Sequence, residues 1–326
     1  MQIPPSYSIT PEMLSLISKI DALRLFFLSY PIPELMKQNI QRMSLLKSSL
    51  FSARIEGNPL TLENIDHASD KEKKMEIFNI QDGANYIKER VKSDENLSKS
   101  LILNLHSIVM KNLRTDAGYF RKEAGAIFNQ AGIAIYMPPP PEYMIELLAK
   151  LIEYVISDQE KFPLIKALIA HLIFEKIHPF IDGNGRVGRL LIFYICKISN
   201  FDFAIFIPFE EYLDKKRSDY YYHLDNGLKD TNRYLIFMLE AFLHETEKLR
   251  DFVIKEQKKK IILPPREQEI FDIIKDHPMI SFDFIRRRFL KIPERTLRYD
   301  LKKLADKNII IKIGKTRGSF YKTADQ

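Results

Sequence analysis

Apolar residues at helical spacing recur through most of the first 250 residues, and this pattern constrains the fold more than any other feature. Such spacing places apolar side chains on one face of a helix. The whole chain of 326 residues contains 11 glycines, so few positions interrupt the pattern. We therefore predict a mainly α-helical fold. The predicted helices are Met13–Leu28, Leu35–Phe51, Met75–Val91, Leu101–Leu113, Tyr143–Ile156, Leu164–Ile177, Gly188–Ile198 and Tyr234–Ile254.

One segment departs from the helical pattern. In Ile127–Met137, β-branched and aromatic residues flank the polar stretch Asn129–Gly132. This arrangement predicts a short β-hairpin. The prolines of Pro138–Pro141 follow, and they are expected to exclude helix over their own length.

A domain boundary is predicted within Lys255–Pro265, where a charged run ends a helix and two prolines stop regular structure. Beyond it, three short helices and then two β-rich runs are predicted, an order that resembles a winged helix-turn-helix. Ser281 is a candidate N-cap for the second of these helices. The predicted elements are Arg266–Lys275, Ser281–Phe289, Pro293 to about Lys307, Ile309–Ile313 and Ser319–Thr323. The predicted domains are residues 1–95, an N-terminal helical region; 96–255, a catalytic core; and 261–326.

The excess positive charge lies in the last of these domains. The formal net charge is +7, and residues 261–326 hold 15 Lys and Arg against 9 Asp and Glu. A polyanionic partner such as DNA is therefore expected there. A module that binds protein or mediates assembly is the alternative. The candidate DNA contacts are Arg295, Thr296, Arg298 and Lys302 on the third helix and Lys315 and Arg317 at the tip of the wing.

Cysteine usage and hydropathy indicate a compartment. Cys196 is the one cysteine, so no intrachain disulfide can form, which suits a reducing cytosol. The N-terminal sequence has no signal-peptide pattern, and no apolar run reaches membrane-spanning length. We expect a cytoplasmic protein that does not bind membranes.

The segment His178–Arg189, HPFIDGNGRVGR, gathers residue types that bind phosphate. Gly183 and Gly185 allow positive φ and a close approach of a ligand to the backbone. If a helix begins at Gly185, its free N–H groups and its dipole form an anion site. Arg186 and Arg189 lie three residues apart on one face, and each guanidinium offers a fork of donors. This arrangement predicts a site for a di- or triphosphate.

Two further residues of the segment suggest chemistry at that phosphate. Asp182 offers a hard oxygen ligand, and Mg²⁺ commonly takes one or two carboxylates together with substrate phosphates. His178 is placed to accept a proton from an attacking hydroxyl. The alternative is a helix–loop–helix corner with a capping Asp182 and arginines that face solvent.

This segment resembles the Fic motif, HxFx[DE]GNGRxxR, at every fixed position. The predicted hairpin resembles the flap with which Fic proteins hold a target segment, and Ser218–Leu224 resembles the YYxxL region beside the nucleotide. The resemblance covers roughly Leu45–His244. It implies a helical Fic fold that transfers AMP from ATP to a Ser, Thr or Tyr hydroxyl of a protein.

By this resemblance, His178 is the general base, Asp182 holds Mg²⁺, and Arg189 holds the γ-phosphate of ATP. Tyr220 and Tyr221 are implied to lie beside the nucleotide, and packing in the core is an equal alternative for either. The implied ATP-binding residues are Gly183, Asn184, Gly185, Arg186, Val187, Gly188, Arg189, Tyr220 and Tyr221. The implied flap residues are Ile127, Phe128 and Asn129.

A second short motif follows the predicted helix Leu35–Phe51. Ser52 and Glu56 lie four residues apart on one helical face, and Gly57 and Pro59 end the helix. The six residues from Ser52 resemble the inhibitory [ST]xxxE[GN] motif of Fic proteins, here within an inhibitory helix of about residues 35–57. The resemblance implies that Glu56 pairs with Arg189 and keeps it from the γ-phosphate. The alternative is a Glu56 exposed to water at a helix end.

Other functions stay open at this point. Glu56 could position a water that removes AMP, which would make the chain a de-AMPylating hydrolase. The chain could also be a DNA-binding regulator that senses ATP through a degraded core, although the intact His178 argues against this. The acceptor hydroxyl could belong to the chain itself, and a homo-oligomer is an open alternative.

Overall fold

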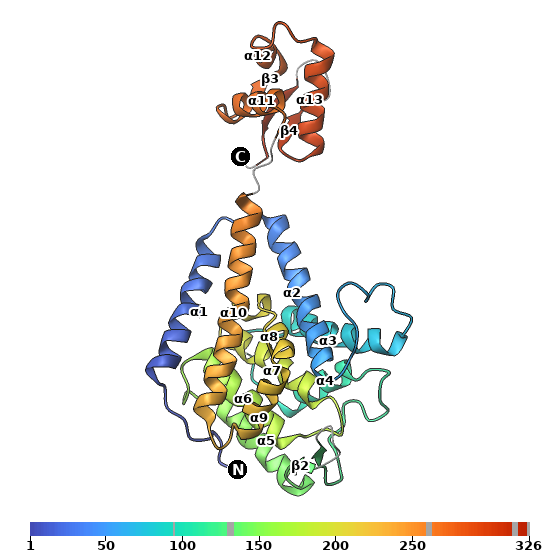
Figure 1. The fold of residues 1–326 in the computed structure, drawn as a ribbon, viewed down its shortest axis with the longest axis vertical. Helices are drawn as coiled ribbons and strands as arrows, with labels where there is room; N and C mark the ends of the chain where they lie inside the picture. The colour runs from blue at the N-terminus through green and yellow to red at the C-terminus, as the bar shows by residue number, and fades with distance from the viewer. Residues whose placement is uncertain (94, 129–133, 259–262, 315–318, 325–326) are drawn as a thin grey trace. The chain divides into compact units, whose positions relative to one another are not determined.

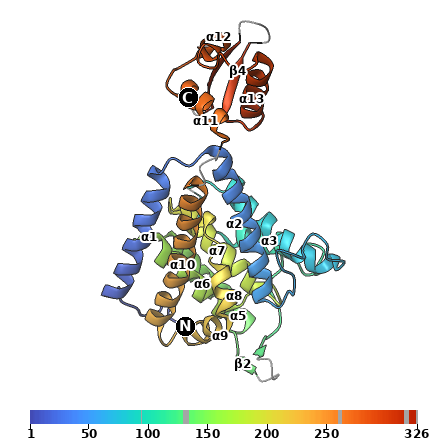
Figure 2. The same ribbon diagram turned by 45° about the horizontal axis from the view of Figure 1, so that its top comes forward.

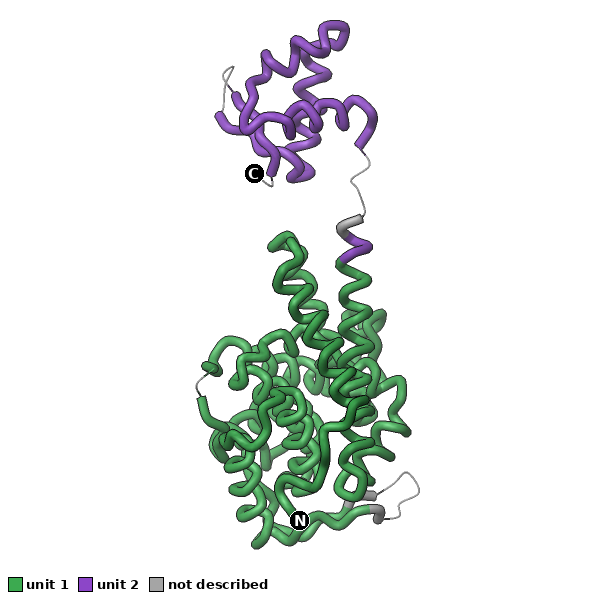
Figure 3. The backbone as a smooth tube through the Cα atoms, turned by 90° about the vertical axis from the view of Figure 1, so that its left-hand side faces the viewer, with its two compact units in different colours: residues 1–253 green, residues 254–326 purple. Residues whose placement is uncertain are grey.

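The computed structural model describes residues 1–326 except 94, 129–133, 259–262, 315–318 and 325–326. The chain divides into two compact units, residues 1–253 and residues 254–326 (Figure 3). Each unit has its own hydrophobic core. The predicted boundary between residues 95 and 96 falls inside the first unit, and the three-domain division stays a prediction.

The first unit is a helical assembly with one small hairpin (Figure 1). Several helices begin at side-chain caps: Thr10, Asp70 and Ser98 each accept a hydrogen bond from the backbone three residues on. Each helix predicted in this unit is present, with bounds that differ by a few residues. The helices are α1 (Pro11–Ser29), α2 (Glu34–Ile55), α3 (Lys71–Arg90), α4 (Lys99–Val109), α5 (Pro141–Ile156), α6 (Pro163–Ile177), α7 (Asn184–Ile198), α8 (Glu210–Lys215), α9 (Arg217–Asn226) and α10 (Thr231–Lys258).

Helices α6 and α7 form the centre of the core. Almost every residue of both is buried, so neither helix has a polar face. They approach each other closely at Gly188: a Cβ there would lie 2.2 Å from Oε1 of Glu175. The corner between α6 and α7, residues 178–183, is therefore held on both sides by fully packed helices.

Three short helical segments were not predicted as separate elements. They are a 3₁₀ helix, Asp202–Phe206, and the helices α8 and α9. Their sequences are short and mixed in polarity, and helices of this length depend on tertiary packing. Helix α8 packs beside the C-terminal half of α2, as Figures 1 and 2 both show.

The predicted hairpin is present in its described part. β1 (Ile127–Phe128) pairs antiparallel with β2 (Ala134–Tyr136), with an irregular register. Asn129 lies outside the described residues. One expectation was wrong: the prolines do not exclude helix through their last member, because Pro141 is the first residue of α5. The first helical position needs no N–H donor, so proline fits there.

After the end of α10, the described residues of the second unit form three helices and a three-stranded antiparallel sheet of order β3-β5-β4. Ser281 caps α12 by accepting from the Phe284 N–H at 3.3 Å, as predicted. The core gathers apolar residues such as Ile270, Leu297 and Leu301. The elements are α11 (Pro265–Lys275), β3 (Ile280–Ser281), α12 (Phe282–Arg286), α13 (Glu294–Asp306), β4 (Ile310–Ile313) and β5 (Phe320–Thr323). The second helix ends three residues before the predicted Phe289, and two-residue β3 was not predicted.

Across the described residues, no helix combines the length and the apolar character needed to cross a membrane.

Candidate functional site

The loop between α6 and α7 has a shape fixed by its own contacts. His178 ends α6 with φ 50°, and Gly183 precedes α7 with φ 83°. Asn184, the first residue of α7, closes the loop with two bonds: its Oδ1 accepts from the Phe180 N–H and its Nδ2 donates to the Phe180 carbonyl, both at 2.9 Å. Phe180 is fully buried and stacks on His106 with ring centroids 3.7 Å apart. The helix therefore begins one residue earlier than Gly185.

His178 is oriented by contacts on its backbone and its ring. The Glu175 carbonyl lies 3.4 Å from Nδ1, and Nε of Arg121 donates to the His178 carbonyl at 2.8 Å. With a carbonyl at Nδ1, Nε2 is the nitrogen left to accept a proton. Burial lowers the pKa of His178. The imidazole is therefore neutral at pH 7, as a general base must be.

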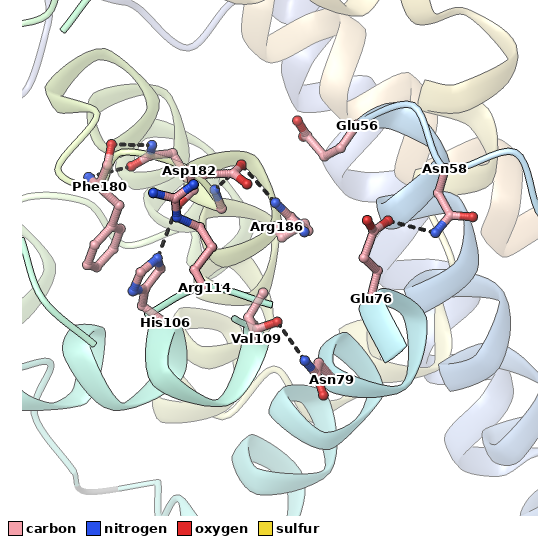
Figure 4. A network of polar contacts seen from close by, with 12 residues as sticks. Glu56, Asn58, Glu76, Asn79, His106, Val109, Arg114, Phe180, Asp182 and Arg186 are labelled. Carbon is pink, nitrogen blue, oxygen red and sulfur yellow. Dashed lines mark hydrogen bonds and ion pairs between the residues drawn. The ribbon is translucent and has the colours of Figure 1, made fainter. Parts of the chain in front are cut away.

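Asp182 and Arg186 face each other across the first turn of α7 (Figure 4). Oδ1 of Asp182 accepts from Nη2 of Arg186 at 2.8 Å and from the Gly183 N–H at 2.6 Å. Burial raises the pKa of Asp182, but the charge of Arg186 and these two bonds outweigh it, so the net direction is downward. Asp182 is thus ionised at neutral pH, and its side chain is half exposed.

Arg189 is fully enclosed, and its donors point at the end of α2. Its Nε donates to Oγ of Ser52 at 2.9 Å, and its Nη2 donates to the Ser52 carbonyl at 2.9 Å and to Oε1 of Glu56 at 2.8 Å. Arg189 is 1% exposed, whereas the Glu56 side chain is 32% exposed. The resemblance implied that Glu56 pairs with Arg189, and the structure contains this pair; the contacts of Ser52 with Arg189 were not predicted.

The Glu56 carboxylate also lies against the first turn of α7. A Cβ on Gly185 would be 2.2 Å from Oε1 of Glu56, so a side chain at this position would require the carboxylate to shift. Free N–H groups and the helix dipole make such a position favourable for an anion. The Glu56 carboxylate therefore lies close to the helix start at which the glycines were predicted to form an anion site.

A buried polar layer lies behind Arg189, and sequence reasoning did not assign it to the site. Burial raises the pKa of Glu175 to about 8 and lowers that of His171 to about 3, so both are largely uncharged at pH 7. His171 contacts Oη of Tyr234 at 2.7 Å and Oη of Tyr220 at 3.4 Å. The signal in the sequence was the placement of His171 two helical turns before His178. Among the described residues, Glu56 is the carboxylate that forms an ion pair with Arg189.

The two tyrosines of α9 have different surroundings. Tyr220 is 1% exposed and belongs to the core. Tyr221 is 38% exposed, and its Oη donates to the Ile55 carbonyl at 3.1 Å, one residue before Glu56. Their placement beside a nucleotide stays a prediction, and for Tyr220 the alternative of core packing agrees with its burial.

Two residues of the motif, Val187 and Gly188, lie in the packed interior between helices. Val187 is fully buried, and its N–H donates to the Gly183 carbonyl at 3.0 Å. Gly188 lies against Glu175, as described above. Their predicted contacts with ATP stay predictions, and a contact through the Val187 side chain would require the core to open.

Arg121 connects the hairpin region to the corner and was missed by sequence reasoning. Beyond the His178 carbonyl, its guanidinium donates to the carbonyls of Glu123, at 2.8 Å, and Pro139. Tyr136 of β2 donates to the Lys176 carbonyl at 2.8 Å. A single arginine in a loop carries no recognisable pattern, so nothing in the sequence pointed to it. These bonds place the base of the hairpin beside His178.

The carboxylate of Asp182 fits a Mg²⁺ ion that is bound jointly by the protein and by phosphate oxygens. Within the described part of the chain, no group of three or more His, Cys, Asp or Glu side chains could hold a metal ion by itself. Asp182 offers one half-exposed carboxylate, and Nε of Arg186 is buried without a hydrogen-bond partner in that same part. One carboxylate plus phosphate oxygens is a common arrangement for Mg²⁺.

In the second unit, acidic neighbours pair with part of the basic surface. Arg298 donates to Glu294 at 2.6 Å and lies over the ring of Phe282. Arg295 and Lys302 are exposed on α13, and Thr296 is half-buried. Lys315 and Arg317 lie outside the described residues. DNA binding by this unit stays a prediction.

Comparison with known proteins points to the same region. Residues 96–196 match the model of the Fic/DOC family. The chain is 28% identical over 151 residues to a probable protein adenylyltransferase of Aquifex aeolicus, covering 45% of this chain and 46% of that protein. It is 32% identical over 134 residues to the protein adenylyltransferase fic-1 of Caenorhabditis briggsae, covering 40% of this chain and 24% of that one. The chain thus matches less than half the length of either relative.

Solved structures show the same fold. A Fic family protein from Desulfovibrio desulfuricans superposes with a TM-score of 0.69 at 23% identity and covers 98% of both chains. A Fic domain protein from Bacteroides thetaiotaomicron superposes with a TM-score of 0.59 at 17% identity, covering 78% of this chain and 99% of that one. The helical Fic fold predicted from the sequence is confirmed.

Proposed function

The chain contains a Fic domain of the Fic/DOC family at residues 96–196, and we propose that it is a protein adenylyltransferase. The observation that carries the proposal is the shared corner of α6 and α7. There, His178, whose pKa is lowered by burial, lies just before a helix N-terminus, and the carboxylate of Glu56 lies close to the first turn of that helix. A polyphosphate would occupy that position, with a base next to the reacting phosphorus.

In the proposed reaction, a hydroxyl oxygen of the target protein attacks the α-phosphorus of ATP. The bond from that phosphorus to the bridging oxygen breaks, and pyrophosphate leaves. Nε2 of His178 takes the hydroxyl proton, and a positioned base of this kind typically contributes about 10²–10⁴-fold. The lowered pKa of His178 keeps this nitrogen free of a proton at pH 7.

The residues of α7 would bind the phosphates. The Gly185 N–H and the guanidinium of Arg186, both on the packed helix, would donate to the developing charge. The Gly183 N–H, which donates to Asp182 in this structure, would join them on releasing that bond. Mg²⁺, when bound, supplies charge neutralisation between the phosphates, and Asp182 is the residue that would hold it. Asn184 acts on the loop shape, since both polar atoms of its side chain bond Phe180.

Glu56 would act as an inhibitor of this site. Its carboxylate holds Arg189, the residue proposed to bind the γ-phosphate, and it fills the space above Gly185. ATP could then bind only without that guanidinium, and its α-phosphate would not meet His178 in line. Activity would depend on the free-energy difference between Arg189 paired with Glu56 and Arg189 paired with phosphate.

The test follows the label of ATP. Wild type, Glu56→Gly and His178→Ala are incubated with ATP labelled at the α- or the γ-phosphorus, with and without Mg²⁺. Protein labelling from the α position alone, increased in Glu56→Gly and lost in His178→Ala, is expected. Labelling from the γ position would overturn AMP transfer. Release of AMP from a labelled protein that requires Glu56 would instead favour the hydrolase.

A further inference from the structure

The end of α2 that carries Glu56 is held by an ion pair on the side away from Arg189. Nε of Arg54 donates to Oδ2 of Asp214 on α8 at 2.9 Å. Asp214 is 6% exposed at its side chain and also accepts from Arg217, so its charge is shared between two guanidiniums. Arg54 is 28% exposed. A pair with one nearly buried partner is screened less by solvent than a surface pair.

Arg54 also forms hydrogen bonds with the segment that follows Glu56. Its Nη1 donates to the Leu60 carbonyl at 3.1 Å, and its own carbonyl accepts from the Gly57 N–H at 2.9 Å. One side chain therefore connects α8 to the segments on both sides of Glu56. Asn58 adds a second anchor, with Nδ2 donating to Oε2 of Glu76 on α3 at 2.7 Å (Figure 4).

By contrast, the Glu56 side chain has few contacts of its own among the described residues. Its carboxylate has one hydrogen bond with Arg189, and its side chain is a third exposed. It lies at the C-cap of α2, where the last carbonyls of a helix lack intrahelical partners and the end can fray. The geometry of the inhibitory contact therefore depends on what fixes the helix end.

We propose that Arg54 and Asp214 are positioning residues for inhibition: their ion pair holds the end of α2 so that Glu56 reaches Arg189. The proposal rests on the inhibitory role of Glu56 proposed above. Asp214 belongs to α8, which leads directly into α9 and Tyr221, whose Oη bonds the Ile55 carbonyl. Inhibition thus has two parts at the end of α2: Glu56 contacts Arg189 of α7, and Arg54 contacts Asp214 of α8.

The test uses Arg54→Ala, because Asp214 keeps Arg217 as a partner and the fold should survive. AMP transfer by Arg54→Ala is expected to rise about fivefold or more over wild type, the lower range of coupling between sites. In the Glu56→Gly background the same substitution should change nothing, since the contact it positions is gone. Arg54→Lys keeps the charge but cannot bond Asp214 and the Leu60 carbonyl at the same time. Its rate of AMP transfer should therefore lie between those of wild type and Arg54→Ala.

Arg217→Ala is the matched control. It removes the other guanidinium from the same carboxylate but breaks no hydrogen bond to α2, so the end of α2 keeps its contacts with Arg54. Activity within about twofold of wild type is therefore expected. Equal activity of Arg54→Ala and wild type would overturn the proposal. An equal increase in the wild-type and Glu56→Gly backgrounds would overturn it too, because Arg54 would then act on catalysis itself.

A binding measurement separates this proposal from the proposed function. Affinity for a non-hydrolysable ATP analogue is measured by calorimetry in the same variants. Arg54→Ala should bind the analogue about fivefold more tightly than wild type, while adding it to Glu56→Gly should leave affinity unchanged. If no variant transfers AMP, the proposed function fails, and the affinities still decide whether Arg54 positions Glu56. Unchanged affinity in Arg54→Ala would contradict the positioning role.

Discussion

The catalytic corner and the inhibitory helix end lie in contact, yet they are built differently. The loop from His178 to Asn184 sits between two buried helices, and Asn184 and Phe180 fix its shape from inside. The segment from Ser52 to Asn58 is held by polar contacts, with Glu56 a third exposed. The difference suggests that the machinery for transfer is organised in advance, whereas the inhibitory contact can be withdrawn without unfolding the core.

The largest effect should come from the corner. His178→Ala, made in the Glu56→Gly background, is expected to lower AMP transfer about 10²–10⁴-fold, because no other group takes the hydroxyl proton. The rate is measured from α-labelled ATP, and circular dichroism checks that the fold is kept. A loss below tenfold would mean that the base lies elsewhere.

The inhibitory end should respond in the opposite direction. Glu56→Gly is expected to raise AMP transfer by about 5–150-fold, since Arg189 becomes available to the γ-phosphate. Glu146→Gly, at an exposed ion pair on α5, is the control for a change of charge and helix propensity. If the two substitutions have equal effects, the inhibitory contact has no influence on turnover.

The packing beneath the corner can be tested through stability. Gly188→Ala is expected to lower the free energy of unfolding by about 1–3 kcal/mol, because its Cβ would meet Oε1 of Glu175 at 2.2 Å in a packed interior. Thermal and urea unfolding measure the change. Glu175→Ala alongside should recover part of the loss by opening space. A Gly188→Ala variant as stable as wild type would show that the contact between Gly188 and Glu175 can open enough to admit a methyl group.

The smallest expected effect is a shift in pH dependence. The proposed mechanism requires neutral His178, and burial lowers its pKa, so the acidic limb of kcat/KM in Glu56→Gly should have its midpoint below 6.5. The rate should therefore rise as pH increases through that midpoint and be level near neutrality. Rate measurements from pH 4.5 to 8 follow the limb. A midpoint above 6.5 would indicate that the imidazole is held as a cation.

A related dependence should appear in stability. Burial lowers the pKa of His171 to about 3, so between that value and its ordinary pKa the unfolded chain binds more protons than the folded one. Its contribution to stability is present above about pH 6.5 and is lost as pH falls toward 3. Urea unfolding as a function of pH should show a smaller loss in His171→Gln. An identical pH dependence in both proteins would show that His171 does not contribute to the loss of stability at low pH.

Much of the fold was predictable because local patterns and tertiary packing agree in it. Helices α5, α6 and α10 follow their apolar spacing, and Ser281 caps the helix that it was expected to cap. Helices α8 and α9 were not predicted, because short mixed sequences gain their helicity from contacts made elsewhere in the chain. The prediction from the proline run was wrong at Pro141, because proline is tolerated in the first turn of a helix although it disrupts the interior.

The sequence by itself determined which groups are available for the proposed chemistry: the order of His178, Asp182, Gly183 and Gly185 places an imidazole, a carboxylate and a helix start within a few residues. Tertiary structure alone decided what surrounds that chemistry. It brought Arg54 to Asp214, 160 residues away in the sequence, and it brought Arg121 to the backbone carbonyl of His178. It also buried Arg189 together with Glu175, a carboxyl group whose pKa burial raises. Local spacing can place side chains on one helix face, but long-range pairing and burial depend on packing between distant segments, which no local pattern encodes.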